Sequence, residues 1–201
     1  VFDADVKNST YTELFEKDHP DRFVQCYIAE QVMVGAAAGA GALGATPVCA
    51  TFAAFFSRAF DQVRMAALSQ TNLKLVGTHA GTHIGEDGGS QMGLEDLALL
   101  RAVQGSTVVY PADPYATEAL LRELCAQRGI GYLRATRGET PVLYDAQEAF
   151  PIGGSKTLRH SDGDRCVVVA AGITLHEALK AHELLAIHDG VAVRVIDAYS
   201  V

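Results

Sequence analysis

Continuous apolar runs alternate with longer helix-like segments along the whole chain. Apolar runs of this kind predict strands that are buried on both faces, as in a parallel sheet covered by helices on either side. We therefore expect an α/β fold, with an open, doubly wound and mostly parallel sheet. The predicted strands are 23–26, 47–50, 73–76, 107–110, 131–134, 165–170 and 191–196, and the predicted helices are 28–43, 52–69, 94–102, 114–128 and 174–188.

A segment rich in proline and glycine, with little helical periodicity, divides the chain near residues 139–156. Such a composition is typical of a link between domains. We predict a first domain over 1–145, a linker over 146–156, and an incomplete second α/β domain over 157–201. Both ends of the sequence lie next to strand-like runs, which indicates a fragment or one piece of a longer chain.

The charge and composition argue against several classes of partner. The net charge of −8 argues against a nucleic-acid-binding or membrane-binding surface, which needs a basic patch. No run reaches the roughly 18 apolar residues of a membrane span. The cysteines are far apart and form no CxxC pair, which favours buried free thiols and a cytoplasmic location. They are Cys26, Cys49, Cys125 and Cys166.

One carboxylate, Glu30, lies at the start of an otherwise almost wholly apolar helix. Burying a carboxylate is costly unless a partner hydrogen-bonds it, and a desolvated carboxyl can hold a proton near neutral pH. This suits a glutamate that exchanges a proton with a ring nitrogen. The alternative is a helix N-terminal glutamate favoured by the helix dipole.

Four phenylalanines follow in the segment 51–62. Phe52 and Phe55 are three residues apart and share one face, whereas Phe56 and Phe60 are four apart on another. All four could belong to the core, or some could pack on a flat ring. A buried glutamate and an aromatic wall together describe a site for an aminopyrimidine.

The segment 77–89 follows a predicted strand and carries five glycines, two histidines and two carboxylates. In open parallel sheets, ligands bind in loops at the carboxyl ends of strands. A metal site is the weaker interpretation, because the glycines argue against a helix that would align His79 with His83. We expect a ligand-binding loop without a metal.

Several motifs occur in a fixed order that together span nearly the whole chain. They are KNST at 7–10, HPDRF at 19–23, IAEQ at 28–31, TFAAFFSRAFDQVRMAA at 51–67, GTHAG at 77–81, IGEDGGSQMGLEDLALLRAV at 84–103 and AGITLHEAL at 171–179. This ordered set resembles transketolase, a thiamine diphosphate-dependent family, over its pyrimidine-binding domain and the start of its C-terminal domain. The resemblance implies the thiamine diphosphate-binding fold.

The resemblance also implies an activity and a set of site residues. Transketolases transfer a two-carbon ketol unit from a ketose phosphate to an aldose phosphate, and Glu30 would exchange a proton with the pyrimidine ring of the cofactor. Phe55 would stack on that ring, with Phe52 beside it, leaving Phe56 and Phe60 in the core. The remaining implied contacts are Gln91 to the cofactor, and Ser9, His79, Asp87 and Arg137 to the sugar phosphate.

Two of these assignments leave an alternative. The weaker alternative for Ser9 is that it caps a helix. Arg134 precedes Arg137 by three residues and could be a surface charge, but Arg137 fits the position of the family motif, and a guanidinium suits phosphate. The sequence also departs from the family at Gly89, where transketolases have proline.

The motif that binds magnesium and diphosphate is absent. Transketolases use GDG followed about 25–30 residues later by asparagine, oxygen ligands of the kind magnesium requires, whereas this chain has no GDG and only Asn8 and Asn72. The resemblance then implies that another domain or subunit completes the binding site for thiamine diphosphate and Mg²⁺, in a homodimer or heteromer. The alternatives are the beta subunit of a 2-oxo acid dehydrogenase, a deoxyxylulose phosphate synthase, or a non-catalytic assembly module.

Overall fold

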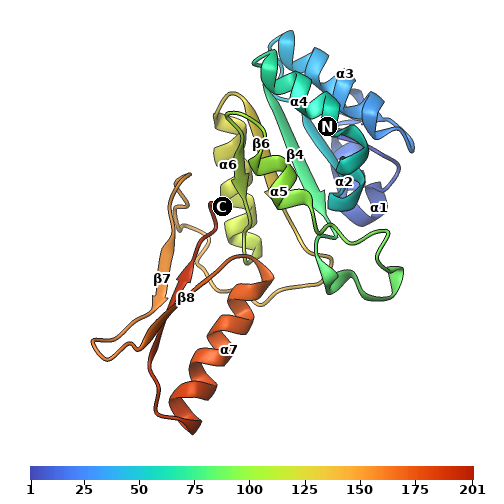
Figure 1. Ribbon diagram of the computed structural model, residues 1–201. Helices are drawn as coiled ribbons and strands as arrows, with labels where there is room; N and C mark the ends of the chain where they lie inside the picture. Colours follow the sequence, from blue (N-terminus) through green and yellow to red (C-terminus); the bar gives the residue numbers. More distant parts are fainter. The chain divides into compact units, whose positions relative to one another are not determined.

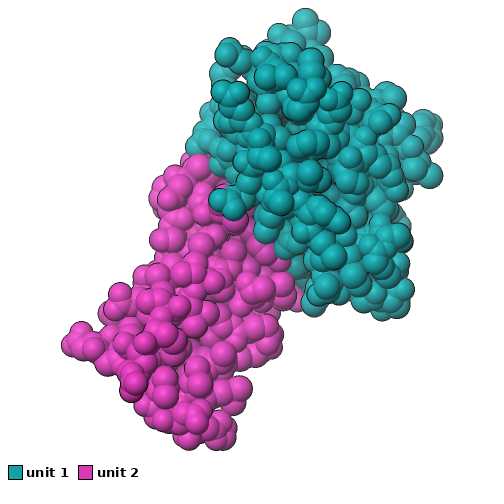
Figure 2. Space-filling model, in the orientation of Figure 1, with its two compact units in different colours: residues 1–108, 124–138 teal, residues 109–123, 139–201 magenta.

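The computed structural model describes residues 1–201 and divides the chain into two compact units. The first consists of 1–108 and 124–138, and the second of 109–123 and 139–201 (Figure 2). No helix in the structure combines the length and the apolar composition needed to cross a lipid bilayer. The predicted domain boundaries at 145 and 157 stay a prediction.

A six-stranded sheet organises the first unit, in the order β2-β1-β3-β4-β6-β5 (Figure 1). The pairs β1–β2, β1–β3, β3–β4 and β4–β6 are all parallel, which confirms the predicted α/β class. The strands are β1 (Phe2–Asp3), β2 (Val24–Gln25), β3 (Val48–Phe52), β4 (Leu73–Thr78), β5 (Thr107–Val109) and β6 (Ile130–Arg134).

Helices connect these strands. The helices are α1 (Lys7–Thr10), α2 (Thr12–Asp18), η1 (Pro20–Arg22), α3 (Glu30–Ala42), η2 (Ala53–Ala59), α4 (Phe60–Leu68), η3 (Thr82–Asp87), α5 (Asp96–Arg101) and α6 (Pro114–Ala126), where η marks a 3₁₀ helix. Parallel strands require such crossovers, because a short turn cannot bring the chain back to the same end of the sheet.

One hydrophobic core of the first unit forms where α3 and α4 pack on the sheet. Met33 and Val34 of α3 pack there with Val63 of α4 and with Leu75 and Tyr132 of the strands, all nearly inaccessible to water. Leucine and valine side chains that leave water in this way contribute roughly 1.5–3 kcal/mol each. Gly77 in β4 is required for this packing, since an added Cβ would lie 2.3 Å from the Tyr132 hydroxyl.

The second unit contains a three-stranded sheet in the order β7-β9-β8. Its elements are β7 (Lys156–Arg159), β8 (Cys166–Ala170), α7 (Ile173–His188) and β9 (Val193–Asp197). β8 and β9 are parallel, β7 is antiparallel to β9, and α7 packs on β8 and β9. Leu175 of α7 and Val193 and Val195 of β9 form the centre of its core.

Three expectations need correction. The segment 52–69 is not one helix, because β3 continues through Phe52 and a 3₁₀ helix, η2, precedes α4. The short helices α1 and α2 were not predicted, since four and seven residues are too few to display a helical period. Cys166, at the start of β8, is an exposed free thiol and Cys26 and Cys125 are half-buried, whereas Cys49 is buried as expected.

Candidate active site

Three neighbouring strands end at one edge of the first sheet. β3 ends at Phe52, β4 at Thr78 and β6 at Arg134, and because the strands are parallel their carboxyl ends lie together. The segments that follow these strands carry most of the predicted site residues. The sheet therefore brings together side chains that are far apart in sequence, at the edge where open parallel sheets bind ligands.

A cavity of about 330 Å³ lies at this edge and gathers six of the eight predicted site residues. Asn8 and Tyr11 complete its lining, and neither was singled out from the sequence as a site residue. The six predicted residues are Ser9, Phe52, His79, Asp87, Gln91 and Arg137. Ser9 lies inside α1, and neither end of that helix has a side-chain cap, so the capping alternative for Ser9 is wrong.

His79 is held firmly in this cavity. Its ring lies parallel to the Phe52 ring, with 3.9 Å between centroids, and its Nδ1 is 3.0 Å from the Thr78 hydroxyl. Burial lowers the pKa of His79, the nearby Arg137 lowers it further, and Asp87 opposes them. A neutral imidazole can both donate and accept a hydrogen bond, as recognition of a sugar hydroxyl requires.

Arg137 and Asp87 line the same cavity and contact each other. Arg137 Nη1 donates to Asp87 Oδ2 at 3.1 Å and to the carbonyl oxygen of Ile84 at 2.9 Å, which ties the guanidinium to the glycine-rich loop. Both side chains are partly exposed. A half-exposed arginine fixed in this way keeps donors available for an anionic group.

Arg134 lies inside the protein, so the alternative of a surface charge is wrong. It donates from Nε to Asp96 Oδ2 at 2.8 Å, and Tyr132 donates to the same carboxylate oxygen at 2.7 Å. Asp96 and Arg134 are both nearly inaccessible to water. Arg134 and Arg137 differ because Arg134 is the last residue of the buried strand β6, whereas Arg137 belongs to the loop that follows it.

Glu30 belongs to a second cavity, of about 520 Å³. It is the first residue of α3, and its side chain is only 4% exposed. Its partner is Arg58, whose Nη1 lies 2.5 Å from Glu30 Oε1. The same guanidinium lies over the Phe55 ring, 4.4 Å from its centroid.

Sequence reasoning missed Arg58, although a signal for it exists. In a 3₁₀ helix residues three apart lie one above the other. Phe55 and Arg58 are spaced in this way within η2, so they share one side, and Phe55 is stacked on Phe52, the last residue of β3, with 5.1 Å between centroids. Ala53, Phe56 and Ala59 form a second, buried side, which confirms Phe56 as a core residue.

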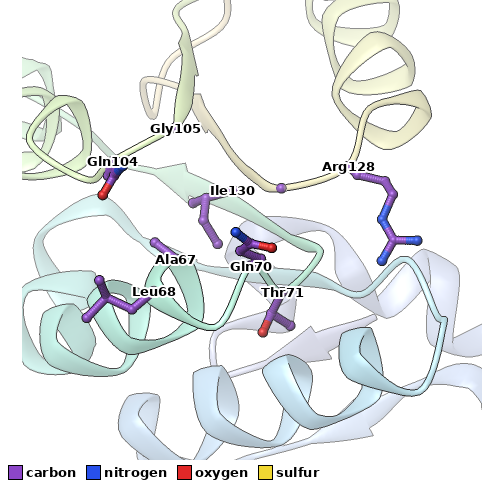
Figure 3. A pocket seen from close by; sticks show the side chains of 9 residues that line it. Ala67, Leu68, Gln70, Thr71, Gln104, Gly105, Arg128 and Ile130 are labelled. Carbon is purple, nitrogen blue, oxygen red and sulfur yellow. The ribbon is translucent and has the colours of Figure 1, made fainter.

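Another cavity, of about 620 Å³, lies elsewhere (Figure 3). Gln70 and Thr71 precede β4, and Arg128 and Gly129 precede β6, so this cavity lies where the strands begin. None of the predicted site residues contributes to it. No group of three or more histidine, cysteine or carboxylate side chains lies close enough to hold a metal ion anywhere in the structure.

Comparison with known proteins agrees with this arrangement. A family model described as "Transketolase, pyrimidine binding domain" matches residues 1–142, and one described as "Transketolase, C-terminal domain" matches 155–201. The chain belongs to the transketolase family. It is 50% identical to human transketolase and 50% identical to bovine transketolase-like protein 1, in both cases over all of this chain but only 32% and 34% of those proteins.

Solved transketolase structures share the fold. A split gene transketolase, described as an inactive beta4 tetramer, superposes with a TM-score of 0.87 at 35% identity, over 99% of this chain and 64% of that one. A transketolase from Pichia stipitis in complex with sedoheptulose 7-phosphate superposes with a TM-score of 0.88 at 27% identity, over 99% and 31%. The chain thus spans about a third of the length of the curated relatives that it matches.

Proposed function

We propose that this chain supplies the pyrimidine-binding and sugar-binding part of a thiamine diphosphate-dependent transketolase. The observation that carries the proposal is the aromatic row formed by Phe55, Phe52 and His79. Phe52 and His79 line the cavity of Asp87 and Arg137, and Phe55 contacts Arg58, which lines the Glu30 cavity. The reaction is the transfer of a two-carbon ketol unit from a ketose phosphate to an aldose phosphate. It would belong to pentose phosphate metabolism.

The residues present fit an aminopyrimidine. Glu30 is a buried carboxyl that needs a hydrogen-bonding partner, and Phe55 offers an aromatic face within reach of the same guanidinium. Bound thiamine diphosphate would supply the chemistry that breaks and forms a carbon–carbon bond next to a ketone. In that site Glu30 would hold or release a proton at its Oε1, and Phe52, Phe55 and Gln91 would hold the ring.

The sugar-binding cavity supplies complementary chemistry. Arg137, a permanent cation, and the hydroxyl of Ser9 are suited to the phosphate of the sugar. Asp87 is suited to accept hydrogen bonds from sugar hydroxyls, and neutral His79 can donate or accept one. The cavity places these groups within a volume of about 330 Å³, which suits one small polar substrate.

The sequence lacks the GDG…Asn motif with which the family binds magnesium and diphosphate. Mg²⁺ commonly takes one or two protein oxygen ligands together with phosphate and water, so such a motif is what it needs from the protein. We infer that the diphosphate and Mg²⁺ are bound by another domain or subunit. The relative that is a split gene transketolase supports a heteromer, and a homodimer of a longer chain is the alternative.

Two further inferences complete the proposal. The free cysteines and the absence of disulfides favour a cytoplasmic enzyme. Among the alternatives, the family match favours transketolase over a 2-oxo acid dehydrogenase subunit or a deoxyxylulose phosphate synthase. The retained Glu30, Phe55, His79, Asp87 and Arg137 favour an enzyme over a non-catalytic assembly module.

The test uses the 201-residue chain with and without a diphosphate-binding region supplied as a separate polypeptide. With thiamine diphosphate, Mg²⁺, xylulose 5-phosphate and ribose 5-phosphate, the chain alone should show no turnover, and the mixture should form sedoheptulose 7-phosphate. Robust turnover by the chain alone would contradict the division of the site. Activity of the mixture with 2-oxo acids but not with ketose phosphates would contradict the assignment of substrate.

A further inference from the structure

Arg58 makes two contacts at the Glu30 cavity with one planar group. Its guanidinium donates to the buried Glu30 carboxylate and covers the Phe55 ring at 4.4 Å. Glu30 and Arg58 line the cavity, and Phe55 adjoins it through its contact with Arg58. A carboxyl and an aromatic face are the two groups that suit an aminopyrimidine. A guanidinium is itself flat and carries several donors, so it resembles such a ring in shape and in hydrogen bonding.

The two occupants exclude each other. At 2.5 Å the Arg58 donor fills the hydrogen-bonding position at Glu30 Oε1, and a pyrimidine that contacts this oxygen and stacks on the ring where Arg58 lies would overlap the guanidinium. Entry of the ring into this position therefore requires the Arg58 side chain to leave.

The surroundings determine how Arg58 can leave. Gln31 Nε2 donates to the main-chain carbonyl of Arg58 at 3.0 Å, which anchors its backbone to α3. The side chain, by contrast, is 50% exposed, so it can rotate into water without unfolding its helix. The ion pair and the cation–π contact that must break are each modest at a half-exposed site.

We propose that Arg58 is a gate on the pyrimidine position: it holds Glu30 and Phe55 and must swing outward for thiamine diphosphate to bind. This inference rests on the proposed function. A gate acts before the ring is seated, so it slows association of the cofactor. A residue that held the ring would instead slow dissociation.

The experiment measures cofactor binding to the active enzyme reconstituted with its diphosphate-binding region. Thiamine diphosphate affinity, at saturating Mg²⁺, is determined by titration calorimetry, and association and dissociation rates by rapid-mixing fluorescence. The variants are Arg58→Ala, Arg58→Lys, which keeps the charge but loses the planar fork, and the control Arg64→Ala. Arg64 forms its ion pair with exposed Asp61 and also donates to Met65 Sδ, and no contact joins it to Glu30 or Phe55.

Arg58→Ala should bind thiamine diphosphate roughly tenfold more tightly, through faster association with an unchanged dissociation rate. Arg58→Lys should fall between Arg58→Ala and the parent, and Arg64→Ala should match the parent. Weaker binding by Arg58→Ala, faster dissociation or an unchanged association rate would overturn the gate while leaving the proposed function intact. If the parent enzyme does not bind thiamine diphosphate, both the proposed function and the gate fall.

Discussion

The imidazole of His79 and the ring of Phe52 lie parallel, with 3.9 Å between their centroids and 13° between their planes. This contact follows from the register of the sheet, because Phe52 of β3 pairs with Thr78 of β4, the residue before His79. Phe55 stacks in turn on Phe52. The candidate site therefore contains one continuous aromatic row. Arg58 joins its Phe55 end to the Glu30 carboxylate, and its His79 end lies in the cavity of Asp87 and Arg137.

The position of His79 leads to a prediction about pH. Burial lowers its pKa from the ordinary value of 6.5, so the folded chain binds this proton more weakly than the unfolded chain. Its contribution to stability is fully present above the unfolded pKa of 6.5, and it is lost as the pH falls below 6.5 and through the lower pKa of the folded chain. His79→Gln should therefore reduce the loss of stability between pH 8 and pH 5.5, measured by urea unfolding.

The control for this prediction is His160→Gln, which removes an exposed histidine from a loop. It should leave the pH dependence of unfolding close to that of the parent. An equal pH dependence in the parent and in His79→Gln would show that protonation of His79 is not coupled to folding.

Asp197 is the basis of a prediction of opposite sign. It is wholly buried, Tyr144 donates to its Oδ2 at 2.6 Å, and its Oδ1 has no hydrogen-bond partner. Desolvation raises its pKa to about 6, so the carboxyl is protonated more readily in the folded chain. The stabilisation from that proton is present below the unfolded pKa of 3.8 and is lost as the pH rises to about 6.

Asp197→Asn keeps the shape of the protonated group. It should raise the free energy of unfolding by about 1–3 kcal/mol at pH 8, where the parent buries a charge, and by much less at pH 5. The exposed Asp189→Asn is the matched control and should shift stability by less than about 0.5 kcal/mol at either pH. A destabilised Asp197→Asn at pH 8 would mean that the charged form is the stabilising one.

Glu30→Gln tests the proposed acid. In the complete enzyme the amide keeps the shape and one hydrogen bond but cannot exchange a proton, so turnover should fall by roughly a hundredfold or more. Cofactor binding should be partly retained. Phe55→Ala should instead weaken cofactor binding, because it removes the stacking surface.

Two measurements separate these variants: cofactor affinity, and hydrogen–deuterium exchange at the thiazolium carbon of the bound cofactor. Glu30→Gln should slow this exchange in the bound cofactor. Phe55→Ala should lower the observed exchange only because less of the enzyme has cofactor bound. Exchange in Glu30→Gln as fast as in the parent would remove Glu30 from the proposed chemistry.

The buried pair of Asp96 and Arg134 should be structural. Asp96→Asn leaves a nearly buried guanidinium without its counter-charge, which should lower the free energy of unfolding by about 3 kcal/mol. The exposed pair of Asp61 and Arg64 offers a control. Asp61→Asn removes the partner of Arg64 at a surface site and should lower the free energy of unfolding by less than about 1 kcal/mol. Equal effects in urea unfolding would contradict the assignment.

The sequence by itself determined the fold class and most strand positions. Continuous apolar runs mark strands buried on both faces, and the predicted strands near residues 47–50, 73–76 and 131–134 correspond to β3, β4 and β6. The family motifs also selected six residues that line one cavity. Apolar runs and motifs are local in sequence, so they can be recognised without knowledge of the packing.

Only the tertiary structure decided which side chains contact one another in and around the site. The hydrophobic pattern of 52–69 does not distinguish a 3₁₀ helix from an α-helix, and Phe55 and Arg58 share one side because η2 is a 3₁₀ helix. Nor does the sequence reveal that Arg58 reaches Glu30, 28 residues earlier, or that Arg134 is buried against Asp96 while Arg137 faces Asp87. Such contacts depend on which helix packs beside which strand, and hence on the order of strands in the sheet.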